Sequence, residues 1–277
     1  MGFDDPIVYP GQPGRSHHHT FFGNTAINAF TTPGNIRLTG NATCRGGTIN
    51  LSGYWVPSMI DTASGSPIAP AWLLVYYKSG TWQYMPDGSV LQPIPYGLRM
   101  IAGDSALHRP GNIGGFHCFN NPSGLIRTVA GYDGQSIPVF CQQGDEVRYT
   151  IPFPQCWDGV NLDSPDHKSH MAYPEMHYAG DPQRQWRCPV GFPVVLPAIT
   201  YTVIYSVPAG ADLSRWRLAS DSADPAVPGG YTRHADWING WDPAISDLWS
   251  ITCIRERRDC GSANLGDGRT TLEFDGN

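Results

Sequence analysis

The sequence predicts a mostly β, single-domain fold of the β-sandwich or jelly-roll kind, with long loops and one helix near the C-terminus. Three features of the composition support this prediction. The 277 residues include 32 glycines and 25 prolines, which suits many short strands joined by turns. Aromatic residues make up 12% of the chain, as expected for strand-rich cores. Charged residues make up only 15%, against roughly 25% in an average soluble domain. The high glycine and proline content argues against a helical bundle.

The strand candidates are segments in which β-branched and aromatic residues alternate or cluster. After an extended lead-in over residues 1–24, we expect strands at Asn35–Thr39, Thr48–Trp55, Ala71–Lys78, Trp82–Met85, Leu98–Ala102, Val147–Pro152 and Val194–Val207. The last of these is expected to be a central strand pair or one long bent strand. Residues 104–136 should be rich in loops, and residues 208–230 should form a polar insertion.

The one predicted helix begins after Asp242, a favourable N-cap, with Pro243 at its first position. Apolar residues then recur at helical spacing: Ile245, Leu248, Trp249 and Cys253. The chain contains no internal repeat and no long linker. We therefore expect residues 1–260 to form one β domain of a catalytic type and residues 261–277 to form a C-terminal tail.

The charge pattern excludes two classes of partner. The net charge is −6 and the chain has no run of lysine or arginine, so neither nucleic acid nor an anionic membrane is expected as a partner. No apolar run approaches the roughly 20 residues of a membrane-spanning helix.

Seven cysteines are scattered along the chain and are never spaced as C-x-x-C, a pattern typical of extracellular disulfides. The expected pairs are Cys118–Cys141, Cys156–Cys188 and, across a turn, Cys253–Cys260, which leaves one thiol over. Residues 1–5 lack the basic and apolar regions of a signal peptide. Because the cysteines favour an oxidising compartment, we expect a secreted, extracellular protein whose leader has been replaced by a starting methionine.

Three clusters of ionisable residues are the candidate chemistry. They are His17-x-His19, then His167-x-x-His170 behind Asp163 and Asp166, and finally His234-x-Asp236. Residues two apart in an extended chain, or three apart in a turn, point to the same side. A divalent metal such as zinc, copper or calcium needs three or four converging ligands, which these clusters can supply. The alternative is metal-free proton transfer by the same histidine, tyrosine and aspartate groups.

Each cluster also has a purely structural interpretation. The H-x-H motif is common in surface strands, and His234 can be a buried histidine that Asp236 fixes. Asp158, Asp163 and Asp166 suit either a glycosidase carboxylate pair or Asx-turns. Trp157 and Trp241 suit either a sugar-stacking wall or a core. The sequence does not show whether the three clusters meet.

The motifs resemble those of a known family. They include G-L-R-M-I-A-G at 97–103, F-P-x-C-W-D-G-x-N-L-D-S-P-D-H-K-S-H-M-A-Y-P at 153–174 and G-Y-x-x-H-x-D-W-I-N-G-W-D at 230–242. From Asp5 to Cys253 the chain is similar to the secreted domain-of-unknown-function family number nineteen-ninety-six. That family occurs in filamentous fungi, often beside WSC-type carbohydrate-binding modules, and in bacteria. The resemblance implies secretion and contact with polysaccharide or cell wall, but no particular activity.

The resemblance also implies a set of signature positions. They are Asp5, His17, His19, Trp157, Asp158, Asp163, Asp166, His167, His170, Tyr173, His234, Asp236, Trp241 and Asp242. Six family cysteines are implied as well, at 44, 118, 141, 156, 188 and 253. These would leave Cys260 as the odd thiol and make Cys44–Cys253 a rival pair. The chain departs from the family in having Asp4 where an arginine is usual, and His18 as an extra histidine.

Our first functional hypothesis is a secreted carbohydrate-active enzyme that cleaves a polysaccharide, as a glycoside hydrolase or a lyase, in an aromatic-lined groove. The candidate catalytic residues are His167, His170, His234, Asp236, Tyr173 and Asp158. The candidate substrate-binding residues are Trp157, Trp241, Arg99 and Lys168. His17, His19 and His234 would hold a metal or orient substrate, Asp236 would fix His234, and His167 or His170 would act as general base.

Two alternatives of other classes stay open. One is a non-catalytic module that binds polysaccharide or cell wall, which explains the aromatic residues but leaves the histidine pairs without a role. The other is an extracellular protein that binds copper or zinc for redox chemistry or scavenging.

Overall fold

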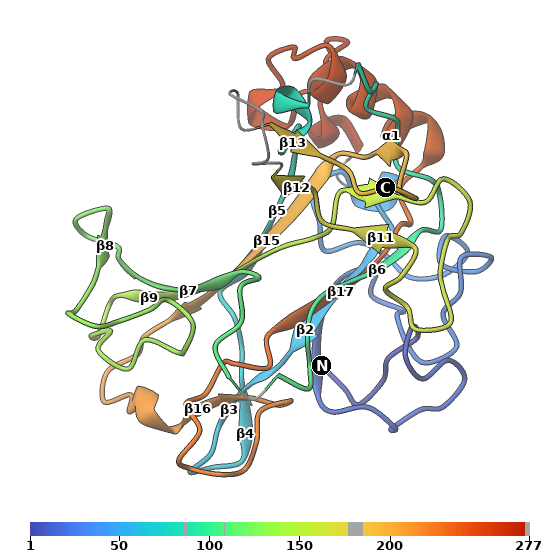
Figure 1. The fold of residues 1–277 in the computed structure, drawn as a ribbon. Coiled ribbons are helices and arrows are strands. Elements are labelled where there is room, and N and C mark those ends of the chain that lie inside the picture. The colour runs from blue at the N-terminus through green and yellow to red at the C-terminus, as the bar shows by residue number, and fades with distance from the viewer. Residues whose placement is uncertain (86–87, 108, 177–184, 275–277) are drawn as a thin grey trace.

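The computed structural model describes residues 1–85, 88–107, 109–176 and 185–274. Within these residues the chain is mostly β, with several sheets and a single α-helix near the C-terminus (Figure 1). The predicted fold class is confirmed, because two large sheets pack face to face as in a β-sandwich. None of the described helices has the length and apolar character needed to cross a membrane.

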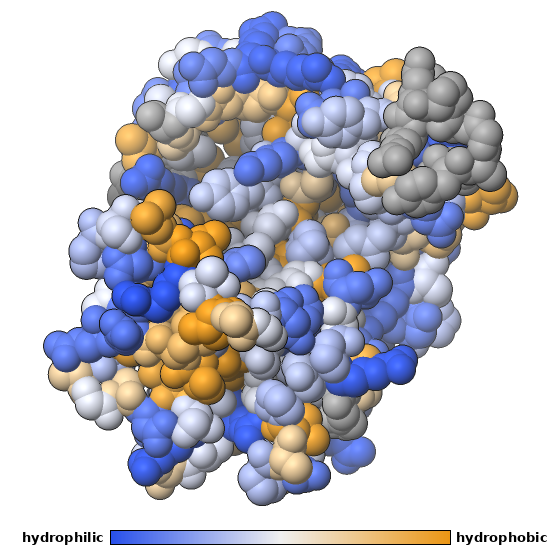
Figure 2. Space-filling view, turned by 60° about the vertical axis from the view of Figure 1, so that its left-hand side comes forward, coloured by the Kyte–Doolittle hydropathy of each residue, from blue (hydrophilic) through white to orange (hydrophobic). Residues whose placement is uncertain are grey.

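The larger sheet has five antiparallel strands in the order β5-β15-β9-β7-β8. Its strands are β5 (Trp72–Lys78), β15 (Ala198–Ser206), β9 (Glu146–Pro152), β7 (Gly115–Asn120) and β8 (Leu125–Arg127). The strands alternate between buried and more exposed positions, as in β9, because one face packs on the core and the other faces outward. Figure 2 brings forward the side of the molecule that carries β8, and hydrophobic patches are visible there between charged residues.

The second sheet has four antiparallel strands in the order β1-β2-β17-β6. They are β1 (His19–Gly23), β2 (Gly53–Pro57), β17 (His234–Ile238) and β6 (Arg99–Gly103). Every residue of β2 and β17 is buried, so this sheet is covered on both faces. A sheet buried on both faces reads as a continuous apolar run rather than an alternating one, and Gly53-Tyr54-Trp55-Val56-Pro57 fits that description.

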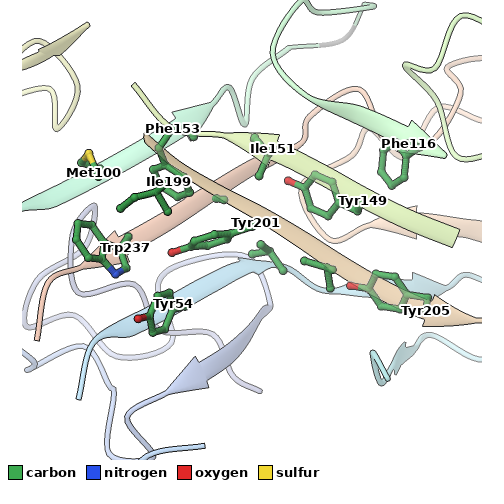
Figure 3. Close-up of a cluster of buried hydrophobic side chains, with 14 of the residues drawn as sticks. Tyr54, Met100, Phe116, Tyr149, Ile151, Phe153, Ile199, Tyr201, Tyr205 and Trp237 are labelled. Carbon is green, nitrogen blue, oxygen red and sulfur yellow. The ribbon is translucent and has the colours of Figure 1, made fainter. Parts of the chain in front are cut away.

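The core lies between the two sheets. Figure 3 shows Tyr149 and Tyr201 reaching from the five-stranded sheet toward β2 and β17, beside Tyr54 and Trp237. The Tyr201 hydroxyl donates a hydrogen bond to the carbonyl oxygen of Asp236, at 3.1 Å, and the Tyr149 hydroxyl donates to the carbonyl oxygen of His234. These two bonds satisfy buried hydroxyls and fix the backbone of β17 from behind.

The opposite face of the four-stranded sheet is covered by the N-terminal segment. Ile7 and Ile36 pack there on Trp55 and Ile238 as a second apolar cluster. In Figure 1 the N-terminal segment and the loop after β10 (Cys156–Trp157) lie on the same side of this sheet. The candidate site lies under these two coverings.

Smaller sheets complete the β structure. They are β10 with β11 (Met171–Ala172) and β14 (Val194–Val195), β12 (Glu175–Met176) with β13 (Trp186–Arg187), and β3 (Met59–Asp61) with β4 (Ser66–Ile68) and β16 (Trp216–Leu218). The 3-10 turns are Gly47–Ile49, Trp82–Tyr84, Leu213–Arg215, Gly261–Ala263 and Thr271–Phe274.

The predicted helix is confirmed as α1 (Pro243–Trp249), and the Asp242 side chain accepts hydrogen bonds from the backbone N–H groups of Ala244 and Ile245. It continues as a π-helix over Ser250–Arg255. Leu265 is buried, so the segment after Gly261 packs on the domain rather than trailing from it.

Several strand predictions are wrong. Residues 35–39 form turns, because the Asn24 side chain donates to the carbonyl groups of Ile36 and Thr39 and so replaces a strand ladder. Residues 82–84 form a 3-10 turn, and residues 48–52 precede β2 without forming a strand. The region 104–136, expected to be rich in loops, also contains β7 and β8, for which no strand was predicted. By contrast, the segment 194–207, predicted as a strand pair or one long bent strand, does contain two strands, β14 and β15, which belong to different sheets.

The three disulfides are Cys118–Cys141, Cys156–Cys188 and Cys253–Cys260, each with a Cα–Cα distance of 5.6 Å. Cys44 is the free thiol. The pairing expected from sequence distance is therefore confirmed. The rival Cys44–Cys253 pair and the odd Cys260 implied by the family resemblance are wrong, because the turn after the π-helix returns Cys260 to Cys253.

Candidate metal centre

The register of the four-stranded sheet places the candidate residues on one face. Phe21 of β1 and Asp236 of β17 both lie opposite Trp55 of β2. Cross-strand partners share a face, and so do residues two apart in one strand. His19 and His234 therefore lie on the face that carries Asp236, beneath the N-terminal segment. His17 precedes β1 and reaches the same place.

Three imidazoles converge on this face. The Nε2 atoms of His17 and His234 are 3.1 Å apart. The ring centroids of His17 and His19 are 4.3 Å apart, and those of His19 and His234 are 5.8 Å apart. One ligand nitrogen from each of the three lies within 4.8 Å of the others, so the group could hold a metal ion. His18 points to the other face, as predicted, where its Nδ1 contacts the Ser58 hydroxyl.

Backbone carbonyl groups set the tautomers of two of these rings. The Nδ1 of His19 lies 3.0 Å from the Asp4 carbonyl oxygen, and the Nδ1 of His234 lies 2.9 Å from that of Thr232. A carbonyl oxygen only accepts, so each Nδ1 carries the proton and each Nε2 keeps its lone pair. Such carbonyl-fixed imidazoles are typical of metal ligands. The prediction that Asp236 fixes His234 is wrong, because their side chains are 3.9 Å apart and Thr232 makes that bond.

All three imidazoles are held neutral. Burial lowers the pKa of His17 to about 4 and that of His234 to about 3. The pKa of His19 lies well below its usual value, first through burial and then through the neighbouring charges of His17 and His234. Neutral imidazole is the form that binds a metal.

Two buried carboxyl groups adjoin the imidazoles. Asp236 is 1% exposed, and neither of its oxygens has a hydrogen-bond partner among the described residues. Asp5 accepts backbone N–H bonds from Ile7 and Val8 on one oxygen, at 2.9 Å each. Burial raises the pKa of both carboxyl groups, and the charge of Asp5 raises that of Asp236 further. If Asp5 and Asp236 are both ionised, they need a nearby cation, because an unpaired buried charge is costly.

The two histidines of the second cluster have different hydrogen-bond partners. His167 has a left-handed backbone with φ of 60°, and its Nδ1 is 3.0 Å from Asp163, which Arg99 holds at 3.1 Å. Burial raises the pKa of Asp5, and an electrostatic interaction with His167 is one of the lesser influences that oppose it. His170 instead uses both nitrogens within the fold, donating to the Arg99 carbonyl at 2.7 Å and contacting the Ser164 hydroxyl at 2.9 Å.

Lys168 and Tyr173 line a cavity of about 260 Å³, together with Tyr231, Asp104 and Gly103; the three imidazoles are not among its lining residues. The Lys168 ammonium donates to the Gly103 carbonyl at 2.9 Å, and Gly103 is the cross-strand partner of His234. The Tyr173 hydroxyl donates to the Pro152 carbonyl, and burial raises its pKa.

Two predicted site residues, Asp158 and Trp157, make hydrogen bonds within their own loop. Asp158 accepts from the backbone of Val160 and Asn161 in a turn, and these bonds lower its pKa although burial opposes them. The Trp157 indole donates to the Asn161 carbonyl.

Trp241 lies apart from the histidines. Its indole donates to the Tyr77 hydroxyl at 3.1 Å, and its ring packs against Trp249. It lines a separate cavity of about 870 Å³ between β5 and the C-terminal helical segment, where Phe22 and Tyr54 present the opposite face of the four-stranded sheet. The expectation that Trp241 walls the histidine site is therefore wrong.

Sequence reasoning took Asp5 only as a signature position and assigned it no chemistry. An aspartate before proline in a turn-rich segment looks like an ordinary Asx-turn, and Asp5 does form one with Ile7 and Val8. What distinguishes it is its burial beside Asp236, which depends on long-range packing.

A family model described as "Domain of unknown function (DUF1996)" matches residues 5–241, which include every residue of this site. No curated protein and no solved structure matches the chain.

Proposed function

The chain belongs to the DUF1996 family and, from that premise, we propose that it is a secreted, metal-dependent enzyme that cleaves a polysaccharide. The family's description assigns no activity, so the proposal depends on the site. One observation carries it: the neutral imidazoles of His17 and His19 converge with that of the distant His234, beside two buried carboxyl groups.

Zinc or copper suits this ligand set. Two ligands about 2.0–2.1 Å from a tetrahedral zinc ion lie about 3.3 Å from each other. The 3.1 Å between the Nε2 atoms of His17 and His234 is close to that value. Copper also accepts imidazole, whereas calcium prefers a shell of oxygen ligands.

A bound ion of this kind polarises substrate oxygens and lowers the pKa of water. His167 is the best placed general base near it. Its Nδ1–H donates to Asp163, which leaves Nε2 as the proton acceptor, and Arg99 holds Asp163 in place. Lys168 brings a positive charge close to His234 and Asp236, which suits stabilisation of developing negative charge.

The walls of the 260 Å³ cavity support the substrate class that we propose. Tyr173, Tyr231, Lys168 and Asp104 offer aromatic rings and hydrogen-bonding groups together, the combination that binds sugar rings and hydroxyl groups. The three disulfides favour an extracellular location, where polysaccharides are the abundant polymers. Hydrolysis and elimination are both compatible with a metal and a histidine base.

The test is incubation of the metal-loaded protein with glucans, mannans, uronans and chitin, with and without chelator. We expect new reducing or unsaturated ends from at least one polymer, lost on chelation and in His234→Ala but kept in His18→Ala. His18 belongs to the same histidine run but contacts Ser58 on the other face. Absence of product from every polymer under both conditions contradicts the proposal for those substrates.

One observation favours a second candidate, an extracellular zinc- or copper-binding protein without catalysis. His19 and His234 are almost completely buried, which leaves little room for a substrate at the ion. Tight metal retention without any product would favour this alternative.

A further inference from the structure

We propose that the cavity of about 870 Å³ between β5 and the C-terminal helical segment binds one fatty acid, with the carboxylate at Arg45 and the hydrocarbon chain between the two large sheets. None of the residues of the histidine site is among those that line this cavity. The inference is therefore independent of the proposed function, and it gives the molecule a second ligand of another chemical class.

The cavity is an unfilled part of the core. Leu73, Val75 and Tyr77 are alternate residues of β5 that pack against the core, yet each stays partly exposed. In Figure 1 the C-terminal helical segment, in red, lies beside the end of β5, and Trp249 and Leu265 line the cavity from that side. Protein interiors contain few voids larger than a water molecule, whereas sites for small molecules measure about 300–1,000 Å³. An opening of this size between two sheets fits a small-molecule ligand.

The polar groups of the inner wall already bond to one another. The Tyr77 hydroxyl accepts a hydrogen bond from the Trp241 indole at 3.1 Å and lies 3.0 Å from the Tyr54 hydroxyl. That second hydroxyl is bonded in turn to the Asn50 side chain. Burial raises the pKa of the Cys44 thiol to about 11, so this group is uncharged as well. A sugar ring would lose its hydrogen bonds to water against such a wall, whereas a hydrocarbon chain has none to lose.

The rim of the cavity carries one positive charge. Among the described residues that line the cavity, Arg45 is the single charged one, although the net charge of the chain is −6. Arg45 is exposed, and its guanidinium group has no ion pair or hydrogen bond with another described residue. A guanidinium group can hold a carboxylate through two parallel N–H bonds. A carboxylate head on an apolar chain therefore matches both the rim and the inner wall.

The experiment is a calorimetric titration of the native protein with dodecanoate below its micelle concentration, and with dodecanol as the uncharged analogue. We expect one dodecanoate per chain, bound at least about tenfold more weakly by Arg45→Gln, because a charge-assisted bond is lost. Dodecanol should bind the native protein and this variant equally. Arg215→Gln is the matched control, because Arg215 is an exposed arginine that lines neither cavity, and it should bind dodecanoate as the native protein does.

A brominated fatty acid gives an independent signal, because bromine quenches the fluorescence of tryptophan rings that it contacts. Trp241 and Trp249 line the cavity, so bromododecanoate should quench part of the native emission and a smaller part in Trp249→Phe. Absence of saturable dodecanoate binding, or binding that Arg45→Gln leaves unchanged, overturns the fatty acid site. His234→Ala should bind dodecanoate as the native protein does, so a failure of this site and a failure of the proposed function give different results.

Discussion

The Nε2 atoms of His17 and His234 lie 3.1 Å apart, although 217 residues separate these histidines in the chain. Thr232 fixes the His234 tautomer so that a lone pair faces His17. Something positive must lie between the two nitrogens, either a proton on His17 or a metal ion. Burial lowers the pKa of both rings, so the two facing Nε2 atoms share one proton rather than carrying one each. A divalent ion can take the place of that proton.

Removal of either nitrogen should weaken metal binding. We expect His17→Ala and His234→Ala to lower zinc affinity at least about 100-fold, since each loses a direct ligand. His18→Ala should change the affinity less than about threefold, because His18 contacts Ser58 on the opposite face. Competition with a chromophoric chelator measures all three. Equal affinities in the three variants would show that the ion binds elsewhere.

The histidines should titrate far below the usual range. Because burial lowers the pKa of His17 to about 4 and that of His234 to about 3, both rings of the metal-free protein should remain neutral at pH 5. Histidine ring resonances in nuclear magnetic resonance spectra report this directly. A midpoint near 6.5 for either ring would contradict the buried arrangement.

The same two pKa values fix the sign of a stability effect. As the pH falls below about 6.5 the unfolded chain takes up protons on these histidines, whereas the folded chain does so only near 4 and 3. Above pH 6.5 these two histidines therefore do not affect the stability of the metal-free protein, and as the pH falls from 6.5 toward 4 they make the folded state progressively less stable. Thermal melts of the metal-free native protein and of His17→Ala, compared from pH 7 to 4.5, should show the smaller loss in the variant.

Substitution of His167 should lower the activity, whereas substitution of His170 should lower the stability. His167→Ala should lower kcat by about 10²–10⁴-fold with metal content unchanged, as expected for a general base. His170→Ala should lower the free energy of unfolding by about 1–3 kcal/mol, because it leaves the Arg99 carbonyl without its donor. Metal analysis, kinetics and thermal melts of both variants separate the roles. Full activity in His167→Ala would remove it from the mechanism.

Cys44 should be the single reactive thiol, and a slow one. Burial raises its pKa to about 11, so at pH 8 only about one molecule in a thousand carries the thiolate. We expect one alkylated cysteine per chain in denaturant, identified as Cys44, and almost none in the native protein. Labelling of Cys260 instead would contradict the Cys253–Cys260 disulfide.

Local signals in the sequence predict local structure well. The alternating residues of β9 and β5, and the Asp242-Pro243 start of α1, are confirmed because neighbouring residues determine them. The strand predicted at residues 35–39 is wrong because the Asn24 side-chain amide donates hydrogen bonds to the carbonyl groups of Ile36 and Thr39. Strands β7 and β8 were missed because glycine-rich flanks resemble loops.

The site depends on contacts between residues that are far apart in the sequence. The same-side placement of His17 and His19 was predicted, but their meeting with His234 follows from the β1-β2-β17 register. The spacing of His167 and His170 suggests equivalent roles, yet His167 contacts Asp163 whereas both nitrogens of His170 have partners within the fold. Trp241 looked like a site wall because of its motif, and only the packing around Tyr77 assigns it to the other side of the sheet.

The most direct test is a crystal structure of the zinc-loaded protein with anomalous scattering measured above the zinc absorption edge. The account predicts a strong peak where the ligand nitrogens of His17, His19 and His234 converge, about 2.0–2.1 Å from at least two of them. A well-ordered structure with no peak at that point, or with zinc bound only elsewhere, would contradict the metal centre.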